Sequence, residues 1–146
     1  MRNKIKVLAA TAAALVTAVV QAGTATAATQ FPSSGAGGIT VDWSGQWENL
    51  NRLDQLSVAL CDQNTSDRNE AVARLEVILY NSQGQARTQL APVVMRVEQY
   101  AAQCKGYKNM YLGYGDTLGW VRVLYYGSVD GTEHYTKWVE NPFMNG

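Results

Sequence analysis

The feature that most constrains the fold of this chain is the alternation of apolar and other residues along two runs, residues 56–61 and 71–80. A period of two residues is typical of β-strands that bury one face. The connection between the runs, residues 62–70, is almost wholly polar and is expected to be a surface loop. The pattern predicts a β-hairpin, in which both runs belong to one sheet.

Similar alternation recurs from residue 39 to the C-terminal end. We expect further strands at residues 39–43, 85–90, 93–97, 107–114, 120–125 and 134–139, with an irregular segment over 44–53. The polar run 85–90 is expected at a sheet edge. The run 93–97 is expected to be a strand followed by a helical turn over 98–103, and the alternative is a helix that begins at Pro92. Asp130-Gly131 is a hairpin signal, so the last three runs are expected to form a meander.

These patterns predict an all-β fold, a single antiparallel β-sandwich of about seven or eight strands over residues 39–146. Cys61 and Cys104 are the only two cysteines. In an exported protein such a pair is expected to form a disulfide, and two free buried thiols are the alternative.

Residues 1–28 have the composition of a secretory signal peptide. Arg2, Lys4 and Lys6 precede an apolar run over residues 7–20, and Ala25-Thr26-Ala27 is a cleavage site. The apolar run is shorter than the roughly 20 residues that a membrane span needs, which favours a secreted, extracellular protein over a membrane anchor. The leader holds three of the 12 basic residues and none of the 12 acidic ones, so the exported chain has a net charge of −3. We therefore expect no binding to nucleic acid or to membranes.

The inventory of reactive residues argues against catalysis. His134 is the only histidine, no G-x-S-x-G motif is present, and zinc would lack histidine and free cysteine ligands. The acidic loop 62–70 lacks the glycine and glutamate of a calcium-binding EF-hand. Paired carboxylates stay open, since no spacing selects a pair. We predict that the protein is not an enzyme and uses no cofactor and no metal.

Residues 29–38 combine proline, serine and glycine with one large apolar residue and no charge. This composition predicts a flexible N-terminal arm, which is either a tail left by processing or a peptide that orders on a partner protein. In the second case the partner-binding residues are Phe31, Pro32, Ser33, Ser34 and Gly35.

The C-terminal third carries aromatic residues in both alternation sets, more than one buried face requires. The excess predicts a protein-binding surface, because Tyr, Trp and Arg are enriched at interfaces. The alternative is that the strands are packed between two layers. The residues expected on the surface are Tyr111, Trp120, Arg122 and Tyr125. Trp43 and Trp47 are candidates either for the core or for a platform that stacks on sugar rings.

One local pattern consists of the leader ending at Ala28, Leu60-Cys61-Asp62 followed by Asp67, an A-x-A-x-L strand at residues 71–75 and one later cysteine. This pattern resembles small exported β-sandwich proteins of actinobacteria. In chain size, cysteine pair and N-terminal arm, the sequence is also similar to the adaptor subunits of the umbrella toxin particles of Streptomyces. Those adaptors join a repeat-containing toxin subunit to a lectin subunit by inserting their N-terminal segment into a cleft of the lectin. The resemblance implies a secreted adaptor with such proteins as partners, and a carbohydrate-binding module or a secreted protease inhibitor is the alternative.

Overall fold

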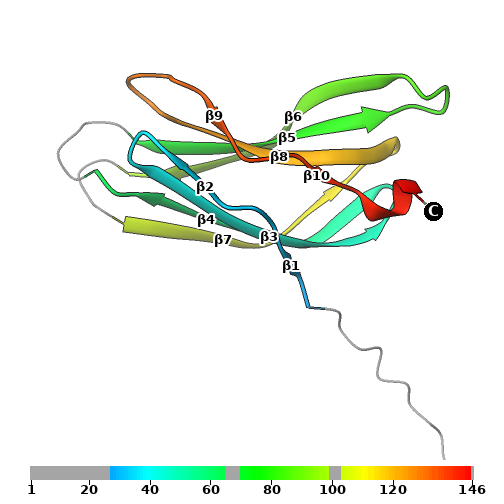
Figure 1. Ribbon diagram of the computed structural model, residues 1–146, viewed down its shortest axis with the longest axis horizontal. Helices are drawn as coiled ribbons and strands as arrows, with labels where there is room; N and C mark the ends of the chain where they lie inside the picture. Colours follow the sequence, from blue (N-terminus) through cyan, green and yellow to red (C-terminus); the bar gives the residue numbers. More distant parts are fainter. Residues whose placement is uncertain (1–26, 65–69, 99–102, 146) are drawn as a thin grey trace, which may run out of the picture.

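Two antiparallel sheets stacked face to face make up this protein, as the computed structural model shows for residues 27–64, 70–98 and 103–145 (Figure 1). The described strands are β1 (Thr29–Gln30), β2 (Ser34–Ala36), β3 (Ile39–Asn49), β4 (Arg52–Asp62), β5 (Ala71–Tyr80), β6 (Ala86–Val97), β7 (Gln103–Gly113), β8 (Thr117–Gly127), β9 (His134–Tyr135) and β10 (Val139–Glu140). Sheet A has the order β1-β3-β4-β7, with β2 also on β3, and sheet B has the order β10-β8-β5-β6, with β9 also on β8. The prediction of an all-β sandwich is confirmed.

The core lies between the sheets and follows the alternation of the sequence. On β5 every second residue from Ala71 to Leu79 is fully buried, and the inward residues of β3, β4 and β8 meet them. The buried set includes Trp43, Leu53, Leu60, Leu75, Met95, Leu118, Val121 and Val123. Trp43 is therefore a core residue, and Trp47 is partly buried against the same cluster.

The expected disulfide is present within sheet A. Cys61 on β4 lies directly opposite Cys104 on β7, and their sulfur atoms are bonded. β7 is an edge strand that pairs only with β4 in the described part of the chain. The bridge thus fastens one end of an edge strand to the middle of its sheet.

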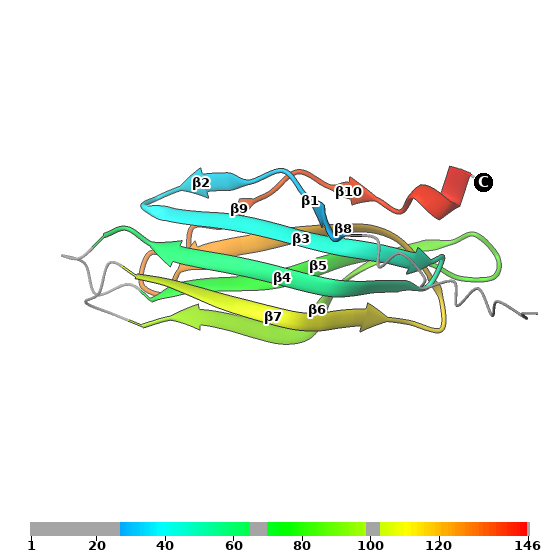
Figure 2. The same cartoon turned by 90° about the horizontal axis from the view of Figure 1, so that it is seen from below.

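The predicted hairpin between residues 56–61 and 71–80 is wrong, because these runs belong to different sheets. β4 pairs with β3 and β7, whereas β5 pairs with β6 and β8. Figure 2 shows β4 in front of β5 rather than beside it. Alternation shows that each run buries one face, but two such strands satisfy it equally well side by side or across the core.

The predicted meander at the C-terminal end is wrong for the same reason. β7 lies in sheet A and β8 in sheet B, so only the turn at Asp130-Gly131 leads to a neighbouring strand. The last run is also split, because at buried Thr136 the side-chain oxygen accepts a hydrogen bond from Val123 N, and Thr136 N donates to Val123 O. β9 and β10 flank this point and both pair with β8.

Two other expectations are refined. Residues 85–90 and 93–97 form one edge strand, β6, whose register against β5 shifts around Pro92. A proline lacks the N–H that a ladder needs, so an edge strand with a register shift is where it fits. Residues 44–53, expected to be irregular, continue β3 and turn into β4, with register shifts after Ser44 and Trp47.

The flexible arm predicted over residues 29–38 is instead part of the fold. β1 and β2 both pair with β3, and between them Phe31 is 5% exposed with its ring centroid 4.6 Å from that of Trp43. Phe31 N donates to Trp43 O, and Trp43 Nε1 donates to Pro32 O. A side chain at Gly45 would come within 3.1 Å of Phe31, so that glycine leaves the space which Phe31 fills.

The domain therefore begins at residue 29, ten residues before the predicted start at residue 39. Gly37 and Gly38 join β2 to β3, and both have the positive φ that a two-residue hairpin turn needs.

The two sheets are joined along both edges. On one edge, the Tyr107 hydroxyl on β7 accepts from Arg96 N and donates to Arg96 O on β6, each at 2.9 Å. On the other, Ser34 on β2 shares a 2.7 Å hydrogen bond with Tyr125 on β8. Figure 2 shows β2 beside β9 along this edge, where the Ser34 hydroxyl also donates to Tyr135 O at 3.5 Å.

The expected signal peptide up to residue 26, the centre of the loop 62–70 and most of the helical turn over 98–103 lie outside the described residues. A short 3-10 helix, η1 (Pro142–Asn145), follows β10. Among the described residues, no helix has the length and apolar character that a bilayer crossing requires.

Candidate protein-binding surface

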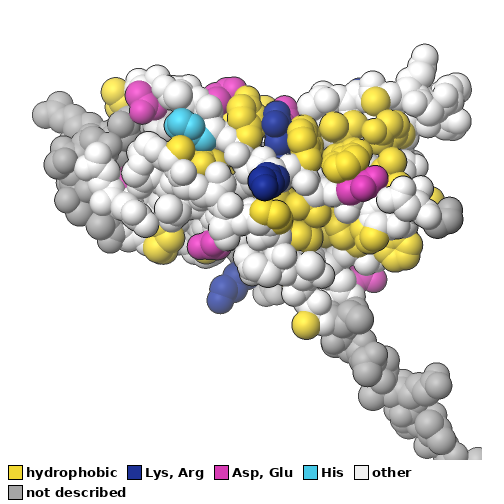
Figure 3. Space-filling view, in the orientation of Figure 1, with side chains coloured by type: hydrophobic (Ala, Val, Ile, Leu, Met, Phe, Trp, Pro, Cys, Tyr) yellow, Lys and Arg dark blue, Asp and Glu magenta, His cyan; other side chains and the backbone are white. Residues whose placement is uncertain are grey.

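The face of sheet B that points away from the core is rich in aromatic and aliphatic side chains. On β5 and β8 the outward residues lie opposite one another, with Ile78 beside Trp120 and Glu76 beside Arg122. β6, β9 and β10 extend this face on both sides. We call this surface the outer face of sheet B. Its large side chains are Glu76, Ile78, Tyr80, Leu90, Val94, Trp120, Arg122, Tyr126, Tyr135 and Trp138, and it also carries Arg74, Thr88 and Arg96. Figure 3 shows hydrophobic side chains gathered over the region where β6, β8 and β10 lie, with a few charged groups between them.

Arg122 is at the centre of this face and is held from three sides. Its guanidinium carbon lies 3.8 Å from the ring centroid of Tyr135 and 4.3 Å from that of Trp138. Its Nε donates to Glu76 Oε2 at 2.5 Å, and the two side chains are only 23% and 17% exposed. A planar guanidinium stacked on two rings is a rigid, partly desolvated group.

The backbone fixes the two rings that cover Arg122. Tyr135 lies opposite Leu124 in the β8–β9 pair, and Val139, next to Trp138, lies opposite Val121 in the β8–β10 pair. The Tyr135 hydroxyl donates to Glu133 at 2.5 Å, and this hydrogen bond is the main reason why the pKa of Tyr135 is raised. At neutral pH the ring is therefore neutral and tethered.

Because Gly119 has no side chain, the Tyr80 ring can pack closely against the β8 backbone, next to Met144 of η1. A Cβ at Gly119 would come within 2.4 Å of the Tyr80 ring and 2.9 Å of Met144 Sδ. Gly119 also sits where the β5–β8 register shifts, between the pairs Ile78–Trp120 and Leu79–Leu118. Tyr80 thus packs directly on backbone, in a place that no residue with a side chain would leave open.

The residues predicted to bind partners do not form one surface. Trp120 and Arg122 are on the outer face of sheet B, whereas Tyr111 is exposed on β7 in sheet A. Tyr125 is 1% exposed and belongs to the core, so its assignment to the surface was wrong. Phe31 is equally buried, while Pro32, Ser33, Ser34 and Gly35 line the β2 edge at exposed or half-buried positions.

Sequence reasoning missed several members of this face, namely Glu76, Ile78, Tyr80, Leu90, Val94, Tyr126, Tyr135 and Trp138. For β5 a signal existed, since Ile78 and Tyr80 are large apolar residues in the alternation set opposite to Val77 and Leu79. Tyr135 and Trp138 could not be assigned, because the break at Thr136 shifts the alternation: Tyr135 lies opposite Leu124, whereas Val139, after Trp138, lies opposite Val121.

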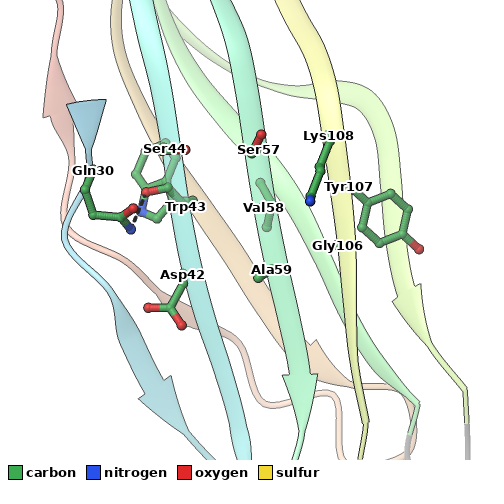
Figure 4. A pocket seen from close by; sticks show the side chains of 10 residues that line it. All are labelled: Gln30, Asp42, Trp43, Ser44, Ser57, Val58, Ala59, Gly106, Tyr107 and Lys108. Carbon is green, nitrogen blue, oxygen red and sulfur yellow. Dashed lines mark hydrogen bonds between the residues drawn. The ribbon is translucent and has the colours of Figure 1, made fainter. Parts of the chain in front are cut away.

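The outer face of sheet A carries a shallow hollow of about 160 Å³. Its floor is formed by Ala59 and Gly106, which lie opposite one another, and Asp42, Ser57 and Lys108 surround them (Figure 4). The Gln30 side chain closes one side by donating to Trp43 O at 2.9 Å. The hollow brings together no pair of groups suited to acid–base or nucleophilic chemistry.

Among the described residues, His, Cys, Asp and Glu side chains form no cluster that could hold a metal ion. Comparisons with protein families, with curated proteins and with solved structures find no match to this chain.

Proposed function

We propose that this protein is a secreted, non-enzymatic adaptor that binds partner proteins through the outer face of sheet B. The observation that supports the proposal best is the apolar character of that face. The exposed face of an antiparallel sheet normally carries polar residues, and a contiguous apolar patch is typical of an interaction site. Arg, Tyr and Trp are the residue types that contribute most to binding energy at interfaces, and Arg122, Tyr135 and Trp138 place all three in contact.

Two further observations are consistent with the proposal. The Cys61–Cys104 disulfide suits an oxidising compartment, as expected for an exported protein with the leader at residues 1–28. His134, the only histidine, packs with its ring 5.5 Å from that of Tyr125 at the β2 edge. This contact gives it a structural role.

The partners we propose are other secreted proteins. The resemblance to umbrella-particle adaptors suggests a lectin subunit and a repeat-containing toxin subunit. Because β1 and β2 are paired with β3, a partner that binds the N-terminal segment would contact an ordered edge, where Pro32, Ser33 and Gly35 are exposed. It would not receive a free arm.

The test is affinity purification of the tagged mature protein from culture supernatant, with mass spectrometry of co-eluting proteins and titration of the partner identified. Leu90→Asp and Val94→Asp place a charge at exposed positions of edge strand β6, so they leave the fold intact. Burying either charge in an interface would be unfavourable, so we expect both variants to lose the partner.

The matched control is Ser57→Asp, which adds the same charge to the outer face of sheet A and should retain the partner. A wild-type protein that elutes alone as a monomer would contradict the proposal. Retention of the same partner by both β6 variants would do so too.

A further inference from the structure

The end of sheet A that contains Tyr111 has two adjoining hollows. One, of about 500 Å³, is lined by the β3–β4 turn, the end of β7 and the start of the β7–β8 connection, with Asn49, Asn51 and Arg52 among its residues. The other, of about 400 Å³, is more apolar and lies between Pro92 and Val93 of β6 and the same end of β7. Tyr111, Gly113 and Tyr114 line both, and each volume is in the range of small-ligand sites.

Tyr111 is the most exposed aromatic ring among the large exposed apolar residues, at 62%. Arg52 covers it from one side, with its guanidinium carbon 4.8 Å from the ring centroid. Beside the ring, a Cβ at Gly113 would lie 3.8 Å from Tyr111 Cδ2 and Cε2, so the glycine leaves ring surface uncovered. A Cβ at Gly115 would meet nothing within 4 Å. The ring is thus both held and open to a ligand.

The polar groups around the ring are pre-arranged. Asn49 Oδ1 accepts from Asn51 N, and Asn51 Nδ2 donates to the carbonyl oxygens of Gly115 and Asp116. These bonds pin the β3–β4 turn to the β7–β8 connection. Within the described residues, Asn49 Nδ2, Asn51 Oδ1 and the Tyr111 hydroxyl make no hydrogen bond. The hollow that the Tyr111 ring lines therefore also holds an unpaired amide donor, an unpaired amide acceptor and the hydroxyl of Tyr111.

The charged groups nearby are already balanced. Arg52 Nε is paired with Asp54 at 2.7 Å, and Asp116 is paired with Arg87 at 2.8 Å. A ligand that carries a charge would compete with these pairs, whereas a neutral ligand with hydroxyl groups would not. Hydroxyls both donate and accept, which matches the unpaired amide atoms, and the apolar face of a pyranose ring matches an aromatic ring.

We propose that this end of sheet A binds a neutral oligosaccharide, with one pyranose ring stacked on Tyr111 and its hydroxyls bonded to Asn49 and Asn51. The site extends from sheet A to the edge where β7 meets β6. None of the residues that line it belongs to the outer face of sheet B, so the proposal does not depend on the adaptor function. Gly113 has a specificity role, since it leaves the ring accessible.

Isothermal titration calorimetry of the mature protein with cellotetraose, chitotetraose and maltotetraose tests the proposal. We expect saturable binding of at least one of the three. Tyr111→Ala should weaken that binding about tenfold, and Tyr111→Phe should keep it within about threefold, because the stacking surface is retained. Gly113→Val should weaken binding while Tyr111 is unchanged, and thermal unfolding should show that this variant is folded.

Phe143→Ala is the matched control, because it removes another exposed aromatic ring, on η1, and should bind like the wild type. Absence of binding by all three oligosaccharides at millimolar concentration would overturn the proposal, as would equal binding by Tyr111→Ala and the wild type. Leu90→Asp, which tests the adaptor function, should bind the oligosaccharide normally, so each idea can fail without the other.

Discussion

The outer faces of the two sheets differ sharply, although both sheets contribute the same kind of apolar inner face to one core. On sheet A the outward residues of β3 and β4 are small or polar, including Thr40, Asp42, Ser44, Ser57 and Ala59. On sheet B the equivalent positions of β5 and β8 carry Ile78, Tyr80, Trp120 and Tyr126. A sandwich needs one apolar face per sheet. The large apolar residues on the outer face of sheet B are therefore not explained by folding alone, and they support the proposed contact with partner proteins.

The sheets also differ in how their edges are secured. Sheet A has the disulfide between β4 and β7, while edge strand β6 of sheet B has no covalent link in the described part of the chain. Conversely, sheet B has the partly buried Arg122 cluster, whereas the cation–ring contacts of sheet A, Arg52–Tyr111 and Lys105–Tyr107, each involve an exposed cation. These contrasts can be tested by stability measurements.

The largest expected effect on the free energy of unfolding comes from removal of the Cys61–Cys104 disulfide in sheet A. In Cys61→Ser/Cys104→Ser the unfolded chain is no longer closed into a loop, and with a sequence separation of 43 the loss should be roughly 4 kcal/mol. Urea unfolding of the variant and the wild type measures it. Amide exchange should rise in β7 more than in β6, and equal protection of both edges would contradict the assignment of the disulfide to the edge of sheet A.

The second largest effect on the free energy of unfolding concerns residues 29–36, which add β1 and β2 to sheet A. Phe31→Ala should lower the free energy of unfolding by about 3 kcal/mol, because it empties a buried site between Gly45 and Trp43. Phe143→Ala, at a position 47% exposed, should change it by less than about 0.5 kcal/mol. Deletion of the first 36 residues without loss of stability would show that the segment is a dispensable arm after all.

Residues 29–38 are one part of the fold that was not predicted correctly from the sequence, although most of the long strands were. Alternation located the long strands because burial of one face imposes it. The disulfide could be predicted because the chain holds only two cysteines, so each has a single possible partner within the chain. The low-complexity composition of residues 29–38 concealed Phe31, yet Gly37-Gly38 before a strand was a hairpin signal. Tyr125 was recoverable too, since it shares its alternation set with Val121 and Val123, which are buried.

What the sequence could not provide was the partition of strands between sheets. β4 and β5, or β7 and β8, alternate in the same way whether they are neighbours or face one another across the core. The aromatic surface depended on this partition: only after β8 is placed beside β5 do Trp120 and Arg122 share a face with Ile78 and Glu76. Tyr111 then falls on the other sheet.

A third prediction compares the two stacked arginines. Arg122→Ala should cost about 2 kcal/mol, because it removes two ring contacts and leaves the Glu76 carboxylate, 17% exposed, without its partner. Arg52→Ala should cost less than about 0.5 kcal/mol, because the Arg52 and Asp54 side chains are 47% and 26% exposed. Urea unfolding of both variants at neutral pH gives the difference. Equal losses would mean that the cluster on sheet B is no more desolvated than the pair on sheet A.

The smallest expected effect is a change in how the free energy of unfolding depends on pH. It compares Tyr114, at the end of sheet A, with Tyr135, on the outer face of sheet B. Burial is the main cause that raises the pKa of Tyr114 above its ordinary value of 10.0, and the hydrogen bond to Glu133 is the main cause for Tyr135. In both cases the folded state holds the proton more tightly than the unfolded state. The stabilisation is complete below pH 10 and is lost as the pH rises further, since the unfolded chain then releases the proton first.

Urea midpoints at about pH 8 and about pH 11 should therefore fall with pH, and Tyr114→Phe should make the fall shallower. Tyr135→Phe should change it less, because Tyr135 is exposed to water, which screens its interaction with Glu133. If Tyr135→Phe had the larger effect, its hydrogen bond would be shielded from solvent even in the isolated protein. The outer face of sheet B would then be covered by its own side chains and less available to a partner than the comparison of the two faces implies.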